Sequence, residues 1–383
     1  MNITKNFKII SLYSTVFLLL SLFTTYLPVW LNKELKLEPV FIGFLLGFIG
    51  LLKIISNFLI TRKIKNVKYL RITLQLLTLI IISNFFFIVF LDTSKYAVIL
   101  FILIFFSLLF FSPLIPISET FCLEYNDNFE KLYGKIRLVG SVSFLFGVLI
   151  FGNLIDTYSI KIFPTICLFS TLMLFISIFF LPKVKKIKSQ ALYDNTLKQL
   201  LKRKHILSII IFCSLLQACH AMYYGFSSML WRENGISYSQ IGLLWGWGVV
   251  AEILLFYKVN SLNLKKYFYS LLILCGLISA IRWFLMFLTF NFYFLFILQT
   301  FHAISFALAH YILMFFIYNF VPKKLRLISN YLYSALSAGL FMTILSITCG
   351  ILYGLNNKGM GFLLMSFVCL ISLLILLKRK EAE

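Results

Sequence analysis

Apolar stretches of about 20 residues recur along the whole of this sequence, separated by short polar segments. An α-helix rises 1.5 Å per residue, so about 20 apolar residues cross the roughly 30 Å hydrocarbon core of a membrane. The first stretch follows Lys5 and Lys8 as in a signal peptide, but it is too long for one and no small-residue cleavage site follows it. The pattern predicts twelve transmembrane helices, at residues 9–31, 40–60, 71–91, 97–121, 136–156, 162–181, 206–231, 240–258, 268–288, 293–320, 328–353 and 359–377.

The composition leaves little room for a water-soluble part. Hydrophobic residues make up 61% of the chain and charged residues 13%, against roughly 45–50% and 25% in a soluble domain. The mean hydropathy of +0.97 is spread over the full length. We therefore expect one all-α polytopic membrane unit.

Basic residues mark the orientation of the predicted helices. Of the 35 Lys and Arg residues, 27 lie in the terminal segments and the even-numbered connections, 6 lie in the odd-numbered connections, and Lys53 and Arg282 lie inside spans. By the positive-inside rule, both termini are cytoplasmic and the protein lies in a bacterial inner membrane. The net charge of +22 does not indicate nucleic acid, because the basic loops are short and separated.

A long basic connection divides the predicted helices into two sets of six. We expect an N-terminal six-helix half at 1–181, a basic cytoplasmic linker at 182–205 and a C-terminal half at 206–383. Two such halves joined by a basic loop are typical of the major facilitator fold, in which the substrate binds near the midplane. A phosphate-binding loop for ATP is not found, so uphill transport has to use an ion gradient. Seven cysteines without paired or metal-type spacing are interpreted as packing residues, and no metal site is predicted.

Charged and histidine side chains inside the spans are costly to insert and usually face a cavity or a partner. From the depth of each residue, Glu252, Arg282 and His302 can meet in the second half. They form either a proton-relay and anion-binding cluster or a salt bridge between Glu252 and Arg282 that only positions helices. The full set inside spans is Lys53, Glu119, His220, Glu252, Arg282, His302 and His310.

Two further groups of residues lie where a cavity is expected. Glu119 and Arg137 are expected to form a gate-like ion pair at the cytoplasmic rim. The two prolines before Glu119 indicate either a broken helix at a cavity or a packing kink. On the seventh span, His220, Tyr224 and Ser227 share a helix face flanked by Gln217 and Tyr223, and Trp245 shares a face with Glu252.

The sequence resembles the 3-phenylpropionic acid permease family of the major facilitator superfamily. The segments that carry the resemblance occur in order across both halves: LLKIISNFLITRKIKN (51–66), YGKIRLVGSVSF (133–144), LLQACHAMYYGFSSMLW (215–231), GVVAEILLF (248–256), AIRWFLMF (280–287) and LQTFHAISFALAH (298–310). The resemblance implies a proton-coupled uptake permease for small organic molecules, with an aromatic carboxylate as the substrate after which the family is named. The family is in turn similar to sugar–proton symporters of the lactose permease type, which have a second carboxyl group where this chain has Ser305.

The sequence thus predicts a secondary transporter and no enzyme, because no catalytic constellation is found. Its partners are a small solute, protons and the lipid bilayer, it needs no cofactor beyond the proton gradient, and we expect a monomer. A proton symporter of a neutral nucleoside or sugar is the alternative. Residues expected to bind substrate are Lys53, Gln217, His220, Tyr224, Trp245, Arg282 and His302; Glu252, His302 and His310 are expected to couple protons.

Overall fold

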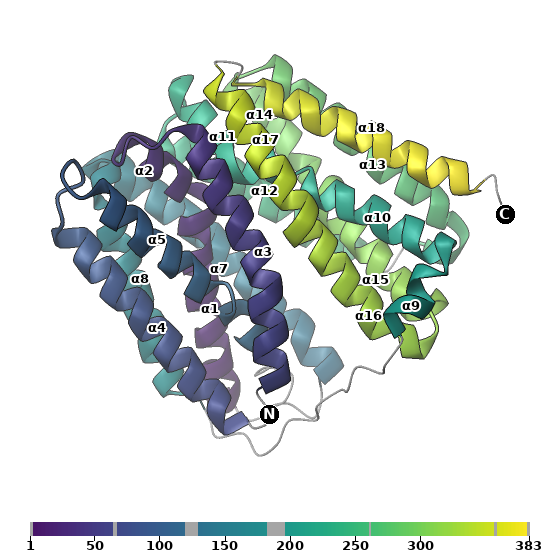
Figure 1. Ribbon diagram of the computed structural model, residues 1–383, viewed down its shortest axis with the longest axis horizontal. Coiled ribbons are helices and arrows are strands. Elements are labelled where there is room, and N and C mark those ends of the chain that lie inside the picture. Colours follow the sequence, from purple (N-terminus) through teal and green to yellow (C-terminus); the bar gives the residue numbers. More distant parts are fainter. Residues whose placement is uncertain are drawn as a thin grey trace. The chain divides into compact units, whose positions relative to one another are not determined.

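The computed structural model describes residues 3–63, 67–118, 129–181, 196–259, 262–355 and 358–380, and within them it contains helices and no strand (Figure 1). The helices of the first part of the chain are α1 (Ile3–Thr25), α2 (Leu27–Lys33), α3 (Pro39–Lys63), α4 (Val67–Phe90), α5 (Ala97–Phe111), α7 (Phe129–Tyr158), η1 (Ile160–Ile162) and α8 (Phe163–Phe179). Those of the second part are α9 (Thr196–Leu201), α10 (Lys204–Ala218), α11 (Ala221–Glu233), α12 (Tyr238–Lys258), α13 (Leu264–Leu288), α14 (Phe292–Thr300), η3 (Ala303–Leu308), α15 (Ala309–Phe320), α16 (Lys323–Ser334), η4 (Ala335–Phe341), α17 (Met342–Gly354) and α18 (Met360–Lys380).

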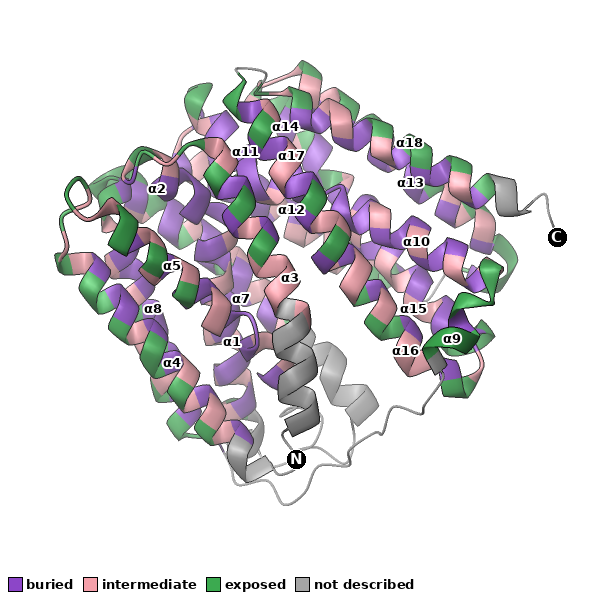
Figure 2. Cartoon of the chain, in the orientation of Figure 1, coloured by how far each residue is buried: buried purple, intermediate pink, exposed green. Residues whose placement is uncertain are grey.

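Most of these helices are long and apolar enough to cross a membrane. Eleven segments of the described residues meet that condition, and the apolar helix Pro39–Leu52 supplies a shorter twelfth. Large apolar side chains such as Leu76, Phe86 and Phe90 on α4 are exposed, as expected where lipid is the solvent. Figure 2 shows that exposed positions recur along α4. The prediction of an all-α multi-pass membrane protein is confirmed.

Contacts between helices divide the chain into two compact units. The first consists of Met1–Leu37, Leu52–Ser189 and Gly235–Gly246, and the second of Glu38–Leu51, Gln190–Asn234 and Trp247–Glu383. Two helices, α3 and α12, are thus shared between the units. The boundaries predicted from the sequence, with a linker at 182–205, stay a prediction, and residues 182–195 lie outside the described part.

In the first unit, the end of α7 holds the start of α12. The Asp156 carboxylate accepts hydrogen bonds from the backbone N–H groups of Tyr238 (3.0 Å) and Ser239 (2.7 Å). These N–H groups lie in the first turn of α12, where backbone N–H groups have no acceptor within their own helix. Nearby, the Tyr26 hydroxyl donates to the Val148 carbonyl at 2.5 Å. The α7–α12 junction is therefore a polar, hydrogen-bonded seam.

The second unit is built around α10, which contacts α15, α16, α18 and the two π-helical segments η3 and η4. In an apolar 18-residue window of the span Lys204–Glu233, made of α10 and α11, 83% of the residues are buried. In the same unit the first half of α3 lies close to α17, where the Thr343 hydroxyl donates to the Gly47 carbonyl at 2.7 Å. A Cβ atom at Gly47 would lie 3.1 Å from the Thr343 backbone, so only glycine fits this approach easily.

Helical geometry is interrupted at two histidines of the second unit. The seventh span, expected as one helix, ends as α10 at Ala218 and resumes as α11 at Ala221, with His220 at the junction. No proline or glycine lies at this break. The His220 Nδ1 atom lies 3.1 Å from both the Leu216 and Gln217 carbonyls, and the Gln217 carbonyl also accepts the His220 backbone N–H at 3.2 Å, so the imidazole adds to the capping of α10. His302 likewise directly precedes the π-helix η3, and such segments are frequent at functional sites.

Candidate functional site

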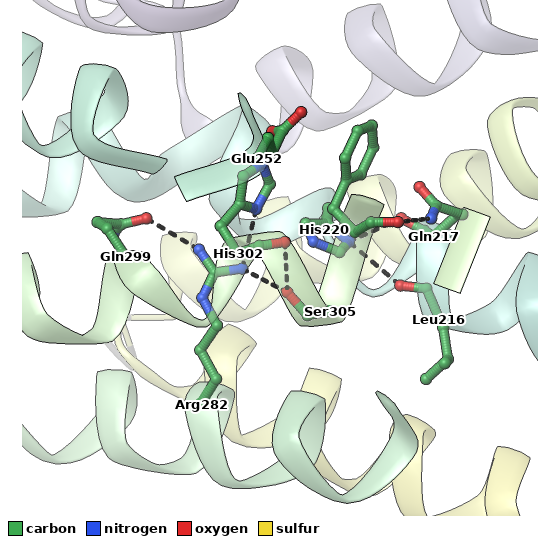
Figure 3. Close-up of polar contacts among 9 residues, drawn as sticks. Leu216, Gln217, His220, Glu252, Arg282, Gln299, His302 and Ser305 are labelled. Carbon is green, nitrogen blue, oxygen red and sulfur yellow. Dashed lines mark hydrogen bonds and ion pairs between the residues drawn. The ribbon is translucent and has the colours of Figure 1, made fainter. Parts of the chain in front are cut away.

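Arg282, on α13, is the centre of a polar cluster in the second unit (Figure 3). Its side chain is 0% exposed. The guanidinium donates from Nη1 to the Ser305 hydroxyl (2.8 Å) and from Nη2 to the side-chain oxygen Oε1 of Gln299 (2.9 Å). Nη1 also lies 3.0 Å from His302 Nδ1. Hydroxyl, amide and imidazole groups thus hold a buried cation.

Glu252, on α12, joins the cluster through His302. Its carboxylate oxygen Oε1 lies 2.9 Å from His302 Nε2, and the two side chains are 15% and 7% exposed. The imidazole therefore stands between the carboxylate and the guanidinium. The direct ion pair of Glu252 with Arg282 that the sequence suggested is replaced by a three-residue bridge.

The tautomer of His302 follows from its partners. A guanidinium has donors only, so the Nδ1 atom facing Arg282 has to offer a lone pair. In a neutral imidazole the proton then resides on Nε2 and is donated to the Glu252 carboxylate. Neutral His302 is in this way fixed in one tautomer by a donor on one side and an acceptor on the other.

His220 has the opposite tautomer. Its Nδ1 faces two backbone carbonyls, which accept only, so Nδ1 carries the proton and Nε2 offers a lone pair. That Nε2 atom is buried and has no hydrogen-bond partner. The imidazole is surrounded by rings, with centroids at 5.0 Å (Trp283), 5.3 Å (His302), 5.5 Å (Phe306) and 5.6 Å (Tyr224).

Aromatic rings also flank the buried guanidinium. The Arg282 Cζ atom lies 4.4 Å from the Trp283 ring centroid and 5.2 Å from that of Tyr223. Cations are attracted to ring faces, more strongly so where water is excluded. The Phe306 ring stacks on His302 at 5.1 Å, and its backbone carbonyl accepts from Gln217 Nε2 at 2.9 Å. The site thus combines a few ionisable groups with an apolar aromatic lining.

Sequence reasoning missed Gln299 and Trp283 as members of the cluster, and it noted Ser305 only as a missing carboxyl. A signal was present. Gln299, His302 and Ser305 follow one another at steps of three residues, which places them on one helix face beside a residue already singled out.

Other predicted site residues lie elsewhere. His310 Nδ1 lies 3.1 Å from the Tyr333 hydroxyl, outside the bridge between Arg282 and Glu252. Trp245 belongs to the first unit, where its ring lies 6.4 Å from that of Phe144. Glu119 and the side chains of Lys53 and Arg137 fall outside the described residues, so the predicted gate and the predicted basic helper stay predictions. Within the described part of the chain no group of three His, Cys, Asp or Glu side chains could hold a metal ion.

Residues 7–364 of the chain match the model of the MFS_1 like family. The chain is 28% identical over 361 residues to the "Probable 3-phenylpropionic acid transporter" of Escherichia coli (strain K12). The aligned residues cover 94% of this chain and 93% of the relative. It is also 27% identical over 180 residues to the "Uncharacterized transporter YwbF" of Bacillus subtilis (strain 168). These aligned residues cover 46% of this chain and 45% of the relative.

Solved structures share the fold at low sequence identity. The nucleoside transporter NupG superposes with a TM-score of 0.75 at 14% identity and covers 99% of both chains. The peptide transporter PepTSo gives a TM-score of 0.74 at 10% identity, covering 99% of this chain and 98% of its own. At such identities the likeness concerns the fold alone.

Proposed function

Because the chain belongs to the MFS_1 like family of membrane transporters, we propose that it is a secondary transporter that carries a small organic anion, of the aromatic carboxylate class, into the cell together with protons. Alternating access would expose the cluster around Arg282 first to one side of the membrane and then to the other. Uptake would be driven by the proton gradient without a further cofactor.

The observation that carries this proposal is the charge balance around His302. In the second unit, the buried positive charge of Arg282 is compensated by Glu252 at the far side of a neutral imidazole. When Glu252 takes up a proton, the cluster is left with one uncompensated positive charge in a medium where such charge is costly. An anionic solute restores neutrality, so binding of the proton favours binding of the anion and the reverse.

The chemistry of the lining supports an aromatic carboxylate. A guanidinium can bind both oxygens of a carboxylate at once, whereas an ammonium acts as a single point charge. Rings of Tyr223 and Trp283 already flank Arg282, and we propose Tyr224 and Trp245 as further contacts of the apolar part of the solute. The name of the E. coli relative mentions 3-phenylpropionic acid, an anion of this class.

The remaining expectations join the proposal. We propose His302 and Glu252 as the proton-coupling residues, with His310 as a further candidate. His220, Gln217 and Lys53 would contact the solute, and Glu119 with Arg137 would form a gate at the inner rim. The protein would act as a monomer in the bacterial inner membrane with both termini in the cytoplasm.

Uptake into proteoliposomes with an imposed pH gradient tests the proposal. Radiolabelled 3-phenylpropionate, nucleosides and sugars are supplied separately, and protein-free liposomes measure the passive entry of the uncharged acid. We expect protein-dependent accumulation of the aromatic acid that is inhibited by other aromatic carboxylates and not by the corresponding amide or methyl ester.

Neutral competitors decide between the anion and the neutral solute. If the amide competes as well as the free acid, or if only nucleosides or sugars accumulate, Arg282 does not bind a carboxylate. The protein would then be a symporter of a neutral solute in which Arg282 only balances Glu252.

A further inference from the structure

We infer that His302 is a tautomer switch, which ties the protonation of Glu252 to the availability of Arg282 for an anion. The inference rests on the proposed function, since it concerns the order of binding at the same site. The imidazole carries no net charge in either end state: it transmits the protonation of Glu252 to Arg282, and after the switch its own Nδ1–H also faces the solute.

The starting state is determined by the contacts of the imidazole. Nε2–H of His302 donates to Glu252 Oε1 at 2.9 Å, and the Nδ1 lone pair faces Arg282 Nη1 at 3.0 Å. The second hydrogen of Nη1 serves Ser305 at 2.8 Å, so both hydrogens of that nitrogen are engaged. Arg282 consequently has no Nη1 donor to offer a solute in this state.

Protonation reverses the roles of both imidazole nitrogens. A carboxylic acid hydrogen on Glu252 Oε1 needs an acceptor, and Nε2 of His302 is the atom that faces it. The Nε2 proton moves to Oε1 along the existing hydrogen bond, and the one proton taken up from bulk water resides at the end on Nδ1. One proton has then been gained in total, and His302 is neutral before and after.

The new tautomer places two donors against each other. Nδ1–H of His302 and Nη1–H of Arg282 cannot bond to one another, because both are donors. The 3.0 Å contact between these nitrogens has to open, while Arg282 keeps Ser305 and Gln299 as anchors at 2.8 and 2.9 Å. Two convergent donors, one of them cationic, then face the gap, and a carboxylate oxygen is the group that accepts from both.

This switch explains how a fully buried arginine becomes available to a solute. Arg282 is 0% exposed, so an anion cannot reach it unless neighbouring groups move. Protonation of Glu252 opens the contact between His302 Nδ1 and Arg282 Nη1 and leaves the other hydrogen bonds of Arg282 in place. It also sets the order of events, with the proton bound before the anion.

Other groups around His302 bear on the same equilibrium. The titratable and charged side chains that face it from the packed helices are Glu252 on α12, Arg282 on α13, His220 at the α10–α11 junction and Tyr223 on α11. His220 offers a buried lone pair on Nε2 and is the competing proton acceptor. The experiment therefore has to distinguish the two histidines.

Solid-state NMR of the [13C,15N]histidine-labelled protein in liposomes measures the tautomer directly, because correlation of each ring nitrogen with its neighbouring ring carbons shows whether Nδ1 or Nε2 carries the proton. Spectra are recorded from pH 9 to pH 5 without solute. The signals missing from His302→Gln identify His302, and those missing from His220→Gln identify His220. We expect His302 to carry its proton on Nε2 at high pH and on Nδ1 at low pH, with the transition absent in Glu252→Gln.

Each other outcome overturns the inference. An unchanged His302 tautomer across the titration means that Glu252 protonates without turning the imidazole, and an imidazolium at low pH means that His302 itself binds the proton. A transition that belongs to His220 moves the switch to that residue. If His302→Gln does not fold, a transition that is lost in Glu252→Gln and retained in His220→Gln still supports the inference, and one that is lost in His220→Gln overturns it. No solute is present, so failure of 3-phenylpropionate transport leaves this test unaffected.

Discussion

Replacing Arg282 by lysine tests the proposed anion clamp. The Arg282 guanidinium binds through two nitrogens, Nη1 to Ser305 and Nη2 to Gln299, at 2.8 and 2.9 Å. A lysine keeps the charge but has one nitrogen, so a bound carboxylate loses one charge-assisted hydrogen bond. Such a bond contributes about 1.5–3 kcal/mol. At about 1.4 kcal/mol per tenfold change, the Kd for the aromatic acid should rise about 10- to 150-fold.

Equilibrium binding of radiolabelled 3-phenylpropionate to the purified protein measures this change. Arg71→Lys is the matched control, because Arg71 in the first unit also donates from two nitrogens, to the backbone carbonyls of Leu181 (3.2 Å) and Phe179 (2.6 Å). We expect that control to bind the acid as the wild type does. Equal affinities in Arg282→Lys and Arg71→Lys would refute the clamp.

Three further predictions concern the proton site, the topology and the α7–α12 seam. Glu252→Gln should abolish accumulation driven by a pH gradient and spare counterflow exchange; continued accumulation would move the proton site to His302 or His220. Single cysteines at Gln190 or Glu383 in a cysteine-free version should react with an impermeant reagent from the cytoplasmic side only, and labelling from outside would reverse the proposed orientation. Asp156→Ala should destabilise the protein by about 0.5–2 kcal/mol, the usual loss for a helix cap. Its unfolding midpoint should be lower than that of the control Asp92→Ala, because the Asp92 carboxylate contacts Ser94 and Lys95 of its own loop. Equal midpoints would argue against the cap.

The fold was accessible from the sequence because the membrane imposes the length and polarity of each span. A helix that crosses hydrocarbon needs about 20 apolar residues whatever it packs against, and the twelve apolar runs could be read without any tertiary information. Charged residues inside those runs were conspicuous for the same reason. This is how Glu252, Arg282 and His302 were singled out.

The details of the site were not accessible in this way. Counting residues gives the depth of a side chain along the membrane normal and not the direction in which it points, so it could not distinguish a direct pair of Glu252 with Arg282 from a bridge through His302. The helix break at His220 could not be predicted from a proline or glycine. Instead, the His220 side chain contributes capping hydrogen bonds to backbone carbonyls. Gln299 was overlooked because an uncharged amide costs less to bury than a charge and so stands out less within an apolar run.

The central claim, that an anion and a proton move together, is tested most directly by measuring both fluxes at once. Proteoliposomes loaded with a pH-sensitive dye receive radiolabelled 3-phenylpropionate while valinomycin and potassium hold the membrane potential at zero, and the signals of protein-free liposomes are subtracted at early times. The account predicts that protein-dependent solute entry and acidification of the lumen rise together, and that both vanish in Glu252→Gln under net-flux conditions. Protein-dependent entry of the anion without acidification would contradict it.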